Sequence, residues 1–137
     1  MVVTFNGALL AKNELRVVQD QLLSALEYGK MQSLLSNKVL TLSPNESSTW
    51  STSVLLYDDK NTNHKFDGGD ELYHSWTFNG RVTIEWRGFH SSNYLMFAKD
   101  ILRSSSSGRF RLNDTSGQSK PIDIIVNRLG RARLSQH

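Results

Sequence analysis

Apolar residues recur along residues 12–36 at the spacing of one face of an α-helix. The segment has no proline and a single glycine, and its charged residues fall between the apolar positions, where they can stay in water. The apolar positions are Leu15, Val18, Leu22, Ala25, Leu26 and Gly29. A helix with one apolar face needs a partner that covers that face. We therefore expect a long helix over residues 12–36 that packs on the rest of the chain.

The β-rich region that follows, residues 38–134, consists of short apolar or alternating runs of strand length. The expected strands cover residues 38–42, 53–57, 71–78, 81–86, 94–97, 109–112, 121–126 and 131–134. Asn79-Gly80 separates two of them, and this dipeptide is typical of a β-hairpin turn. One helix followed only by strands predicts an α+β fold, with the helix packed on antiparallel sheet in a single domain over residues 1–137.

Composition excludes several classes of protein. An apolar content of 38% with 21% charged residues describes a globular domain rather than a disordered chain. The absence of cysteine excludes a disulfide framework, a thiolate metal site and a cysteine nucleophile. No apolar run approaches the roughly 20 residues that a membrane span requires.

Charge is distributed unevenly along the chain. Residues 1–80 carry six Lys/Arg against nine Asp/Glu, a net charge of −3, whereas residues 81–137 carry ten against four, a net charge of +6. Ordinary solubilising charge accounts for this asymmetry as well as an anionic partner does.

Arg128, Arg131 and Arg133 lie within six residues of one another, with no acidic residue among them. If residues 131–134 are extended, Arg131 and Arg133 point the same way, roughly 7 Å apart, with Ala132 and Leu134 toward the core. Paired guanidinium groups suit a phosphate polyanion. Arginines that protect a sheet edge are an equal alternative.

Enzymatic and metal-binding patterns are weak. The four histidines are scattered, and no P-loop or dinucleotide fingerprint is present, so we expect no catalytic residues and no cofactor. The serine run at residues 104–108 indicates a flexible turn rather than a nucleophile. The polar loop over residues 58–71 overlays a calcium loop imperfectly, because His64 replaces the required glycine; we favour Asx turns over a metal site. The overlaid positions are Asp59, Asn61, Asn63, Asp67 and Asp70.

The order of these features resembles the GspH/FimT family of type IV pilin-like proteins over nearly the whole chain. The helix runs into a V-T-L-x-P-like segment at residues 39–44, and a tryptophan precedes the second strand. The remaining motif residues are Asp59, Asn61, Asn63, Asp67 and Glu71 of the loop, Gly108, Phe110 and Leu112 of a G-x-F-x-L strand, and the Gly130-Arg131-Ala132-Arg133 element. Relatives often carry cysteines where this chain has Ser43 and Asn113, so we expect packing alone to hold those places.

The resemblance implies a non-enzymatic minor pilin. Its G-R-x-R element is similar to that of minor pilins linked to DNA uptake in natural transformation, which favours non-specific binding of double-stranded DNA. The predicted DNA-binding residues are Arg128, Arg131, Arg133, Lys120, Arg109 and Arg111. The alternative is a minor pseudopilin of a type II secretion system that binds no DNA.

The resemblance also implies partners and a location. We expect contacts with other pilins through the N-terminal helix, and a transmembrane half-helix ahead of residue 1, since the chain starts like a cut edge. Such a protein resides in the bacterial inner membrane with a periplasmic domain before assembly, and afterwards in a pilus fibre at the cell surface.

Overall fold

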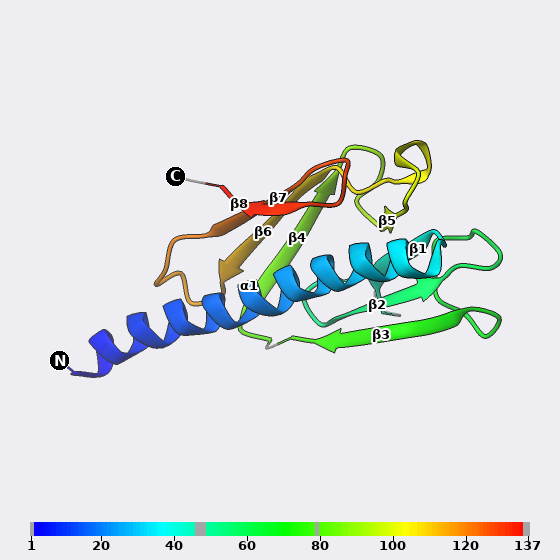
Figure 1. The fold of residues 1–137 in the computed structure, drawn as a ribbon. Coiled ribbons are helices and arrows are strands. Elements are labelled where there is room, and N and C mark those ends of the chain that lie inside the picture. Colours follow the sequence, from blue (N-terminus) through cyan, green and yellow to red (C-terminus); the bar gives the residue numbers. More distant parts are fainter. Residues whose placement is uncertain (1, 46–48, 79, 136–137) are drawn as a thin grey trace.

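A computed structural model describes residues 2–45, 49–78 and 80–135, in which a long helix lies across two antiparallel sheets (Figure 1). The helix is α1 (Val2–Ser36), and a single 3₁₀ turn is η1 (Ile101–Arg103). Sheet A has the order β3 (Glu71–Thr77), β2 (Ser53–Asp58), β1 (Leu40–Pro44), β5 (Leu95–Phe97). Sheet B has the order β4 (Val82–Gly88), β6 (Gly108–Asp114), β7 (Ile122–Val126), β8 (Ala132–Leu134). The predicted α+β architecture is confirmed.

The apolar face of α1 is buried, as its spacing predicts. The side chains of Leu15, Val18, Leu22 and Leu26 are at most 1% exposed. They form one core with residues from both sheets, among them Leu56 of sheet A and the aromatic and aliphatic residues of sheet B. The helix is therefore the element that holds the two sheets together.

The helix begins at Val2, well before the expected start near residue 12. Residues 8–11, Ala-Leu-Leu-Ala, favour helix strongly even without a partner. Leu9 and Leu10 are about half exposed, and the blue end of the ribbon projects beyond the sheets (Figure 1). Apolar periodicity predicts only the part of the helix that packs against the sheets, and it does not reveal the N-terminal part that projects beyond them.

The predicted hairpin at Asn79-Gly80 is wrong. Asn79 lies outside the described residues, but the flanking strands belong to different sheets: β3 pairs with β2, and β4 pairs with β6. β4 buries Val82, Ile84 and Trp86 on one face, as its alternation predicts. Burial of three large side chains against the helix and β6 outweighs a local turn preference.

Ser43 and Asn113, the two places that we expected packing alone to hold, lie in β1 of sheet A and β6 of sheet B. Ser43 is buried, and its hydroxyl lies 2.8 Å from the Tyr57 hydroxyl, with which it forms a hydrogen bond. The expectation that packing alone holds this place is therefore corrected at Ser43. Among the described residues, no helical stretch combines the length and the hydropathy needed to cross a bilayer.

Candidate nucleic-acid interface

The turn that carries the C-terminal arginines, residues 127–131, is built around Asn127. The Asn127 side-chain oxygen accepts hydrogen bonds from the backbone N–H of Leu129 at 2.9 Å and of Arg131 at 3.0 Å. The Asn127 carbonyl accepts from the N–H of Gly130, and the Asn127 N–H donates to the carbonyl of Arg131. This arrangement is an Asx-type turn that closes the link between β7 and β8.

Gly130 seats this turn against the helix. It has φ +83°, a left-handed conformation that glycine adopts without steric cost. A Cβ atom at this position would lie 3.0 Å from Cδ of Lys30 and 3.3 Å from Cδ1 of Phe97. The glycine of the G-R-x-R element is therefore explained by turn geometry and close packing, whatever the arginines bind.

Two buried serines hold the turn from the other side. Ser104 donates a hydrogen bond to the carbonyl of Arg128, and Ser106 donates to the carbonyl of Asn127, both at 2.8 Å. Their exposed fractions are 8% and 1%. The prediction of a flexible turn at residues 104–108 is wrong for these two serines, because each hydroxyl satisfies a carbonyl of the arginine-bearing turn.

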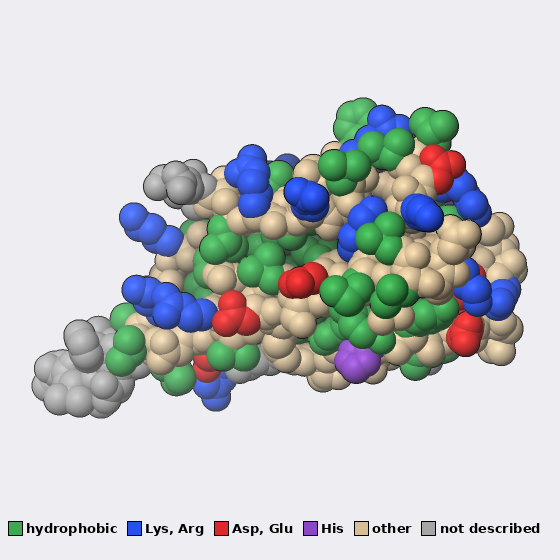
Figure 2. All heavy atoms as spheres, viewed as in Figure 1, with side chains coloured by type: hydrophobic (Ala, Val, Ile, Leu, Met, Phe, Trp, Pro, Cys, Tyr) green, Lys and Arg blue, Asp and Glu red, His purple; other side chains and the backbone are tan. Residues whose placement is uncertain are grey.

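Arg128, Arg131 and Arg133 are all exposed, as predicted. Arg131 precedes β8 and borders a groove of about 560 Å³ between α1 and the β7–β8 turn. Figure 2 shows hydrophobic side chains in this hollow, with lysine and arginine side chains above it and acidic side chains along its lower border. The groove is lined by Leu23, Glu27, Lys30, Met31, Leu34, Gly130, Arg131 and Ala132.

Arg133 lies in β8 opposite Ile125. Ala132 and Leu134 lie opposite Val126 and Ile124. The side chains of Val126 and Ile124 are buried, whereas that of Leu134 is 44% exposed. Because side chains alternate along a strand, Arg133 takes the outer face of sheet B. Among the described residues, none of Arg128, Arg131 and Arg133 forms an ion pair.

Arg109 lies on the same outer face. In the sheet register Ile125 separates it from Arg133, and on its other side it lies directly opposite Arg87 of β4. Arg87 is not among the DNA-binding residues predicted from the sequence. The alternation of residues 81–86 extends to it, but only the β4–β6 pairing reveals that the two arginines are neighbours.

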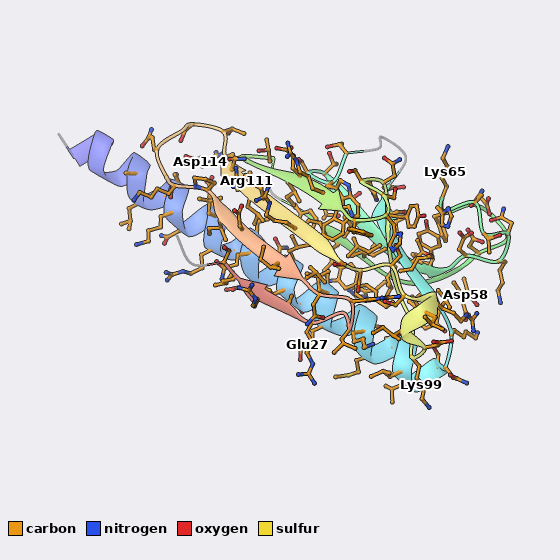
Figure 3. The ribbon with its side chains drawn as sticks, turned by 90° about the horizontal axis from the view of Figure 1, so that it is seen from above. Glu27, Asp58, Lys65, Lys99, Arg111 and Asp114 are labelled. Carbon is orange, nitrogen blue, oxygen red and sulfur yellow. The ribbon has the colours of Figure 1, made fainter. Side chains whose placement is uncertain are left out.

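Arg111 is engaged differently from Arg109. Its Nε and Nη2 each donate a hydrogen bond of 2.8 Å to the carboxylate of Asp123, a residue only 3% exposed. Hydrogen bonding to Asp123 raises the pKa of the Arg111 guanidinium. Figure 3, which looks onto sheet B with α1 behind it, labels Arg111. The guanidinium compensates a buried charge of the protein itself, so a phosphate would meet only its remaining N–H groups and a positive charge that Asp123 already offsets.

Lys120 lies apart from the turn. It precedes β7, whereas Arg128 and Arg131 follow that strand, so the five residues of β7 separate them. At strand geometry this length is about 17 Å. The structure thus brings Arg109, Arg128, Arg131 and Arg133 to one end of sheet B and leaves Lys120 at the other.

The polar loop over residues 58–71 is held by its own hydrogen bonds. Oδ2 of Asp67 accepts from the amides of Asn61 and Asn63, which lowers the pKa of Asp67. Asp70 accepts the backbone N–H of Lys60 and of Asp67. Oδ1 of Asn63 accepts the backbone N–H of Lys65, two residues later, at 3.0 Å, and this contact supports the Asx-turn interpretation.

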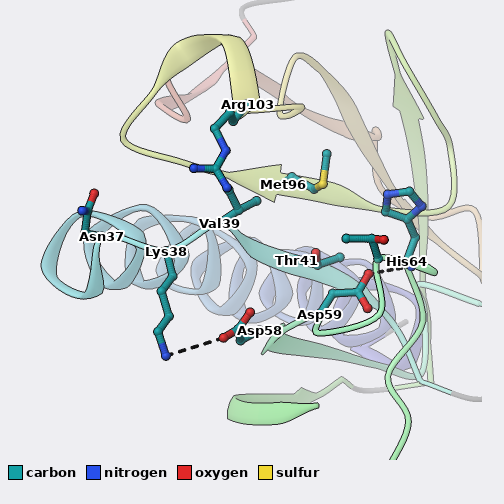
Figure 4. Close-up of a pocket in the computed structure, with 10 residues that line it drawn as sticks. Asn37, Lys38, Val39, Thr41, Asp58, Asp59, His64, Met96 and Arg103 are labelled. Atoms are coloured by element: carbon teal, nitrogen blue, oxygen red, sulfur yellow. Dashed lines mark hydrogen bonds and ion pairs between the residues drawn. The ribbon is translucent and has the colours of Figure 1, made fainter. Parts of the chain in front are cut away.

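A hollow of about 450 Å³ lies beside this loop (Figure 4). The ionisable residues that line it include Lys38, Asp58, Asp59, His64 and Arg103. Oδ2 of Asp59 accepts the backbone N–H of His64 at 2.7 Å, and its buried Oδ1 has no hydrogen-bond partner among the described residues. Within the same part of the chain, no group of His, Cys, Asp and Glu residues is arranged to hold a metal ion.

Comparisons with known proteins bear on both the sequence and the fold. The family profile described as type II transport protein GspH matches residues 19–130. No curated protein matches the chain. The crystal structure of the type IV minor pilin FimU from Pseudomonas aeruginosa strain PAO1 in space group P21 has a TM-score of 0.68 at 11% identity, covering 91% of this chain and 90% of that one. The P65 form has a TM-score of 0.67 at 9% identity, covering 88% and 92%.

Proposed function

This chain belongs to the GspH family of type IV pilin-like proteins, and on that premise we propose that it is a minor pilin that binds double-stranded DNA without sequence preference. The protein supports DNA uptake in natural transformation in this proposal, and its role is non-enzymatic. Its place is the inner membrane, with the described domain in the periplasm, and then the pilus fibre.

The observation that supports DNA binding is the group of exposed arginines at the β7–β8 turn and on β8, none of which forms an ion pair among the described residues. Asn127, Ser104 and Ser106 fix the backbone that carries Arg128 and Arg131. A fixed backbone lowers the entropy that is lost when the guanidinium groups meet phosphate. Guanidinium binds phosphate oxygens bidentately, and contacts of this kind carry no base information.

The site centres on Arg128, Arg131 and Arg133, with Arg109 on the adjoining face of sheet B. Arg111 contributes less in this proposal because it is bound to Asp123. Lys120 contributes less because β7 separates it from the turn. Cofactors and metal ions have no part in the proposed binding.

Contacts with other pilins are assigned to α1. Its N-terminal part exposes Leu9, Leu10 and Val17, each about half accessible. Exposed apolar side chains along one helix are typical of an interaction surface. This assignment holds equally for the alternative function, a minor pseudopilin of a type II secretion system that does not bind DNA.

A titration with duplex DNA separates the two functions. A fluorescent 20-base-pair duplex is titrated with the domain while anisotropy is recorded, and an NMR titration identifies the residues affected. The double variant Arg131→Gln/Arg133→Gln should lose most binding, while Lys12→Gln/Arg16→Gln, which removes the same charge from exposed helix positions, should retain it. With three phosphate contacts, log K should fall against log salt with a slope of about −3. Absence of binding by the parent at low salt would establish the pseudopilin alternative.

A further inference from the structure

We propose that the DNA duplex lies across the strands of sheet B, with its phosphates contacting a row of three arginines, Arg87, Arg109 and Arg133. This inference rests on the proposed DNA-binding function and extends the site from the C-terminal turn to the outer face of the sheet. It assigns a role to Arg87, which lies more than forty residues before the G-R-x-R element.

The sheet register places the three arginines in one line. Arg87 pairs with Arg109, Arg109 with Ile125, and Ile125 with Arg133. Residues in register across a sheet share a face, and neighbouring strands lie about 4.8 Å apart. The row therefore spans about 14 Å perpendicular to the strands. It lies at the end of sheet B that also carries the turn with Arg128 and Arg131.

The pairing of Arg87 with Arg109 places two positive charges directly opposite each other. Like charges at such a position destabilise a sheet. Neither arginine forms an ion pair with any described residue. A bound polyanion would convert this unfavourable pair into a favourable site.

The adjacent row of the same face shows the opposite arrangement. There Glu85 lies opposite Arg111, and Arg111 lies opposite Asp123. The bidentate contact between Arg111 and Asp123 compensates the arginine, and with Glu85 the adjacent row has a net charge of −1. The uncompensated positive charge on these two rows is thus confined to the line of Arg87, Arg109 and Arg133, which gives the proposed DNA contact a direction.

Edge protection does not explain the row. β4 and β8 are the outer strands of sheet B, so Arg87 and Arg133 could each serve to block edge pairing. Arg109, however, lies on β6, which is paired on both sides. An arginine in the middle of the sheet protects no edge.

The dimensions of the row suit a phosphate backbone. Each DNA strand presents a phosphate about every 3.4 Å of helix axis, so 14 Å covers about four phosphates. Ile125, between Arg109 and Arg133, is partly exposed and offers no polar group for a base edge. The row therefore favours binding that is independent of sequence.

Single variants test the proposal by the same anisotropy titration. Arg87→Gln and Arg109→Gln should each weaken binding about fivefold to tenfold at 0.1 M salt and reduce the salt slope by about 0.9. The parent slope should be about −4.5, since five arginines contact phosphate, rather than about −3 for the turn and Arg133 alone. Arg87→Lys should retain much of the affinity and the full slope.

The matched control is Arg81→Gln. Arg81 lies just before the other end of β4 and pairs with Glu14 at 2.7 Å, so its loss changes net charge equally but should weaken binding less than about twofold. If the parent binds and only Arg131→Gln/Arg133→Gln loses affinity, the row is wrong while the proposed function stands. If the parent does not bind DNA, the arginine row and the proposed DNA-binding function are both wrong. Side-chain Nε shifts of Arg87 and Arg109 during titration of the parent decide the question without any variant, and their absence would also overturn the row.

Discussion

Arg111 of β6 donates two hydrogen bonds of 2.8 Å to the carboxylate of Asp123 on β7. The carboxylate is 3% exposed, whereas the arginine side chain is 40% exposed. Arg109, two residues earlier on the same face, has no ion pair within the described chain. The two arginines of β6 thus have different roles. Arg111 compensates a buried charge of the protein, and Arg109 is available to a ligand.

Replacement of Arg111 should therefore reduce stability more than DNA affinity. In Arg111→Gln a buried carboxylate loses both hydrogen bonds, and the free energy of unfolding should fall by about 1–3 kcal/mol. Urea denaturation measures the change, with Arg109→Gln as the control of equal charge and an expected change below about 0.5 kcal/mol. Equal stability of the two variants would contradict the assigned roles.

Gly130→Ala should destabilise the domain more than Gly117→Ala does. Both glycines have positive φ, +83° and +73°, so alanine at either should cost about 1 kcal/mol of backbone strain. Only at Gly130 would the added Cβ also meet Lys30 and Phe97, because the space around Gly117 is open. Thermal unfolding of the two variants separates strain from crowding; matching midpoints would mean that the contact with α1 is unimportant.

Ser106→Ala should loosen the arginine-bearing turn without touching an arginine. Loss of its hydrogen bond leaves the Asn127 carbonyl without that donor and should cost about 0.5–1.5 kcal/mol. Amide hydrogen exchange at Leu129 and Arg131 should become faster. Ser105→Ala is the control, because the Ser105 side chain forms no hydrogen bond with any described residue and the variant keeps the backbone bridge to Met96. Unchanged exchange in Ser106→Ala would show that the serine does not secure the turn.

Stability should decline at alkaline pH through Tyr57. Burial raises the pKa of its phenol to about 12, while the unfolded chain ionises near the ordinary value of about 10. Between these values only the unfolded state releases the proton, so the stability contribution is complete below about pH 10 and is lost by about pH 12. Urea denaturation at pH 9, 10 and 11 should show a steeper loss for the parent than for Tyr57→Phe. A comparison at pH 7 isolates the lost hydrogen bond to Ser43, and parallel pH profiles would contradict the prediction.

Calcium at millimolar concentration should produce no binding heat in calorimetry. Asp67 and Asp70 already accept hydrogen bonds from their own loop, and these would have to be broken for the oxygens to coordinate a cation. Among the buried side-chain nitrogen and oxygen atoms of the described residues, only Oδ1 of Asp59 lacks a hydrogen-bond partner. Heat that disappears in Asp59→Asn would instead identify a cation site in this loop.

Local periodicity was sufficient to predict the individual elements. The stripe of α1 and the alternation in β4 and β6 are buried as the sequence indicates, because each depends only on residues a few positions apart. The partners of the strands could not be predicted in this way. The predicted hairpin at Asn79-Gly80 is wrong because the chain passes from one sheet to the other there. Which strands pair is decided by the apolar faces that the folded chain buries, and these lie far apart in sequence.

The candidate site shows the same limit. Arg128, Arg131 and Arg133 are close in sequence, so their spacing alone marks them as candidates, and the resemblance of the G-R-x-R element favours DNA as their ligand. Arg87 could not be identified in this way, since its proximity to Arg109 exists only through the β4–β6 register. The sequence likewise gives no sign that Asp123 binds Arg111. Only the β6–β7 register reveals that the two residues lie opposite each other.

β8 is three residues long and is held to the sheet by β7 alone. A load applied only to this strand would peel it from the edge, breaking its hydrogen bonds one after another. A duplex that also rests on Arg109 and Arg87 would divide the same tension among β8, β6 and β4. A duplex bound to the whole row would therefore be anchored at three strands of sheet B, which a short terminal strand cannot provide by itself.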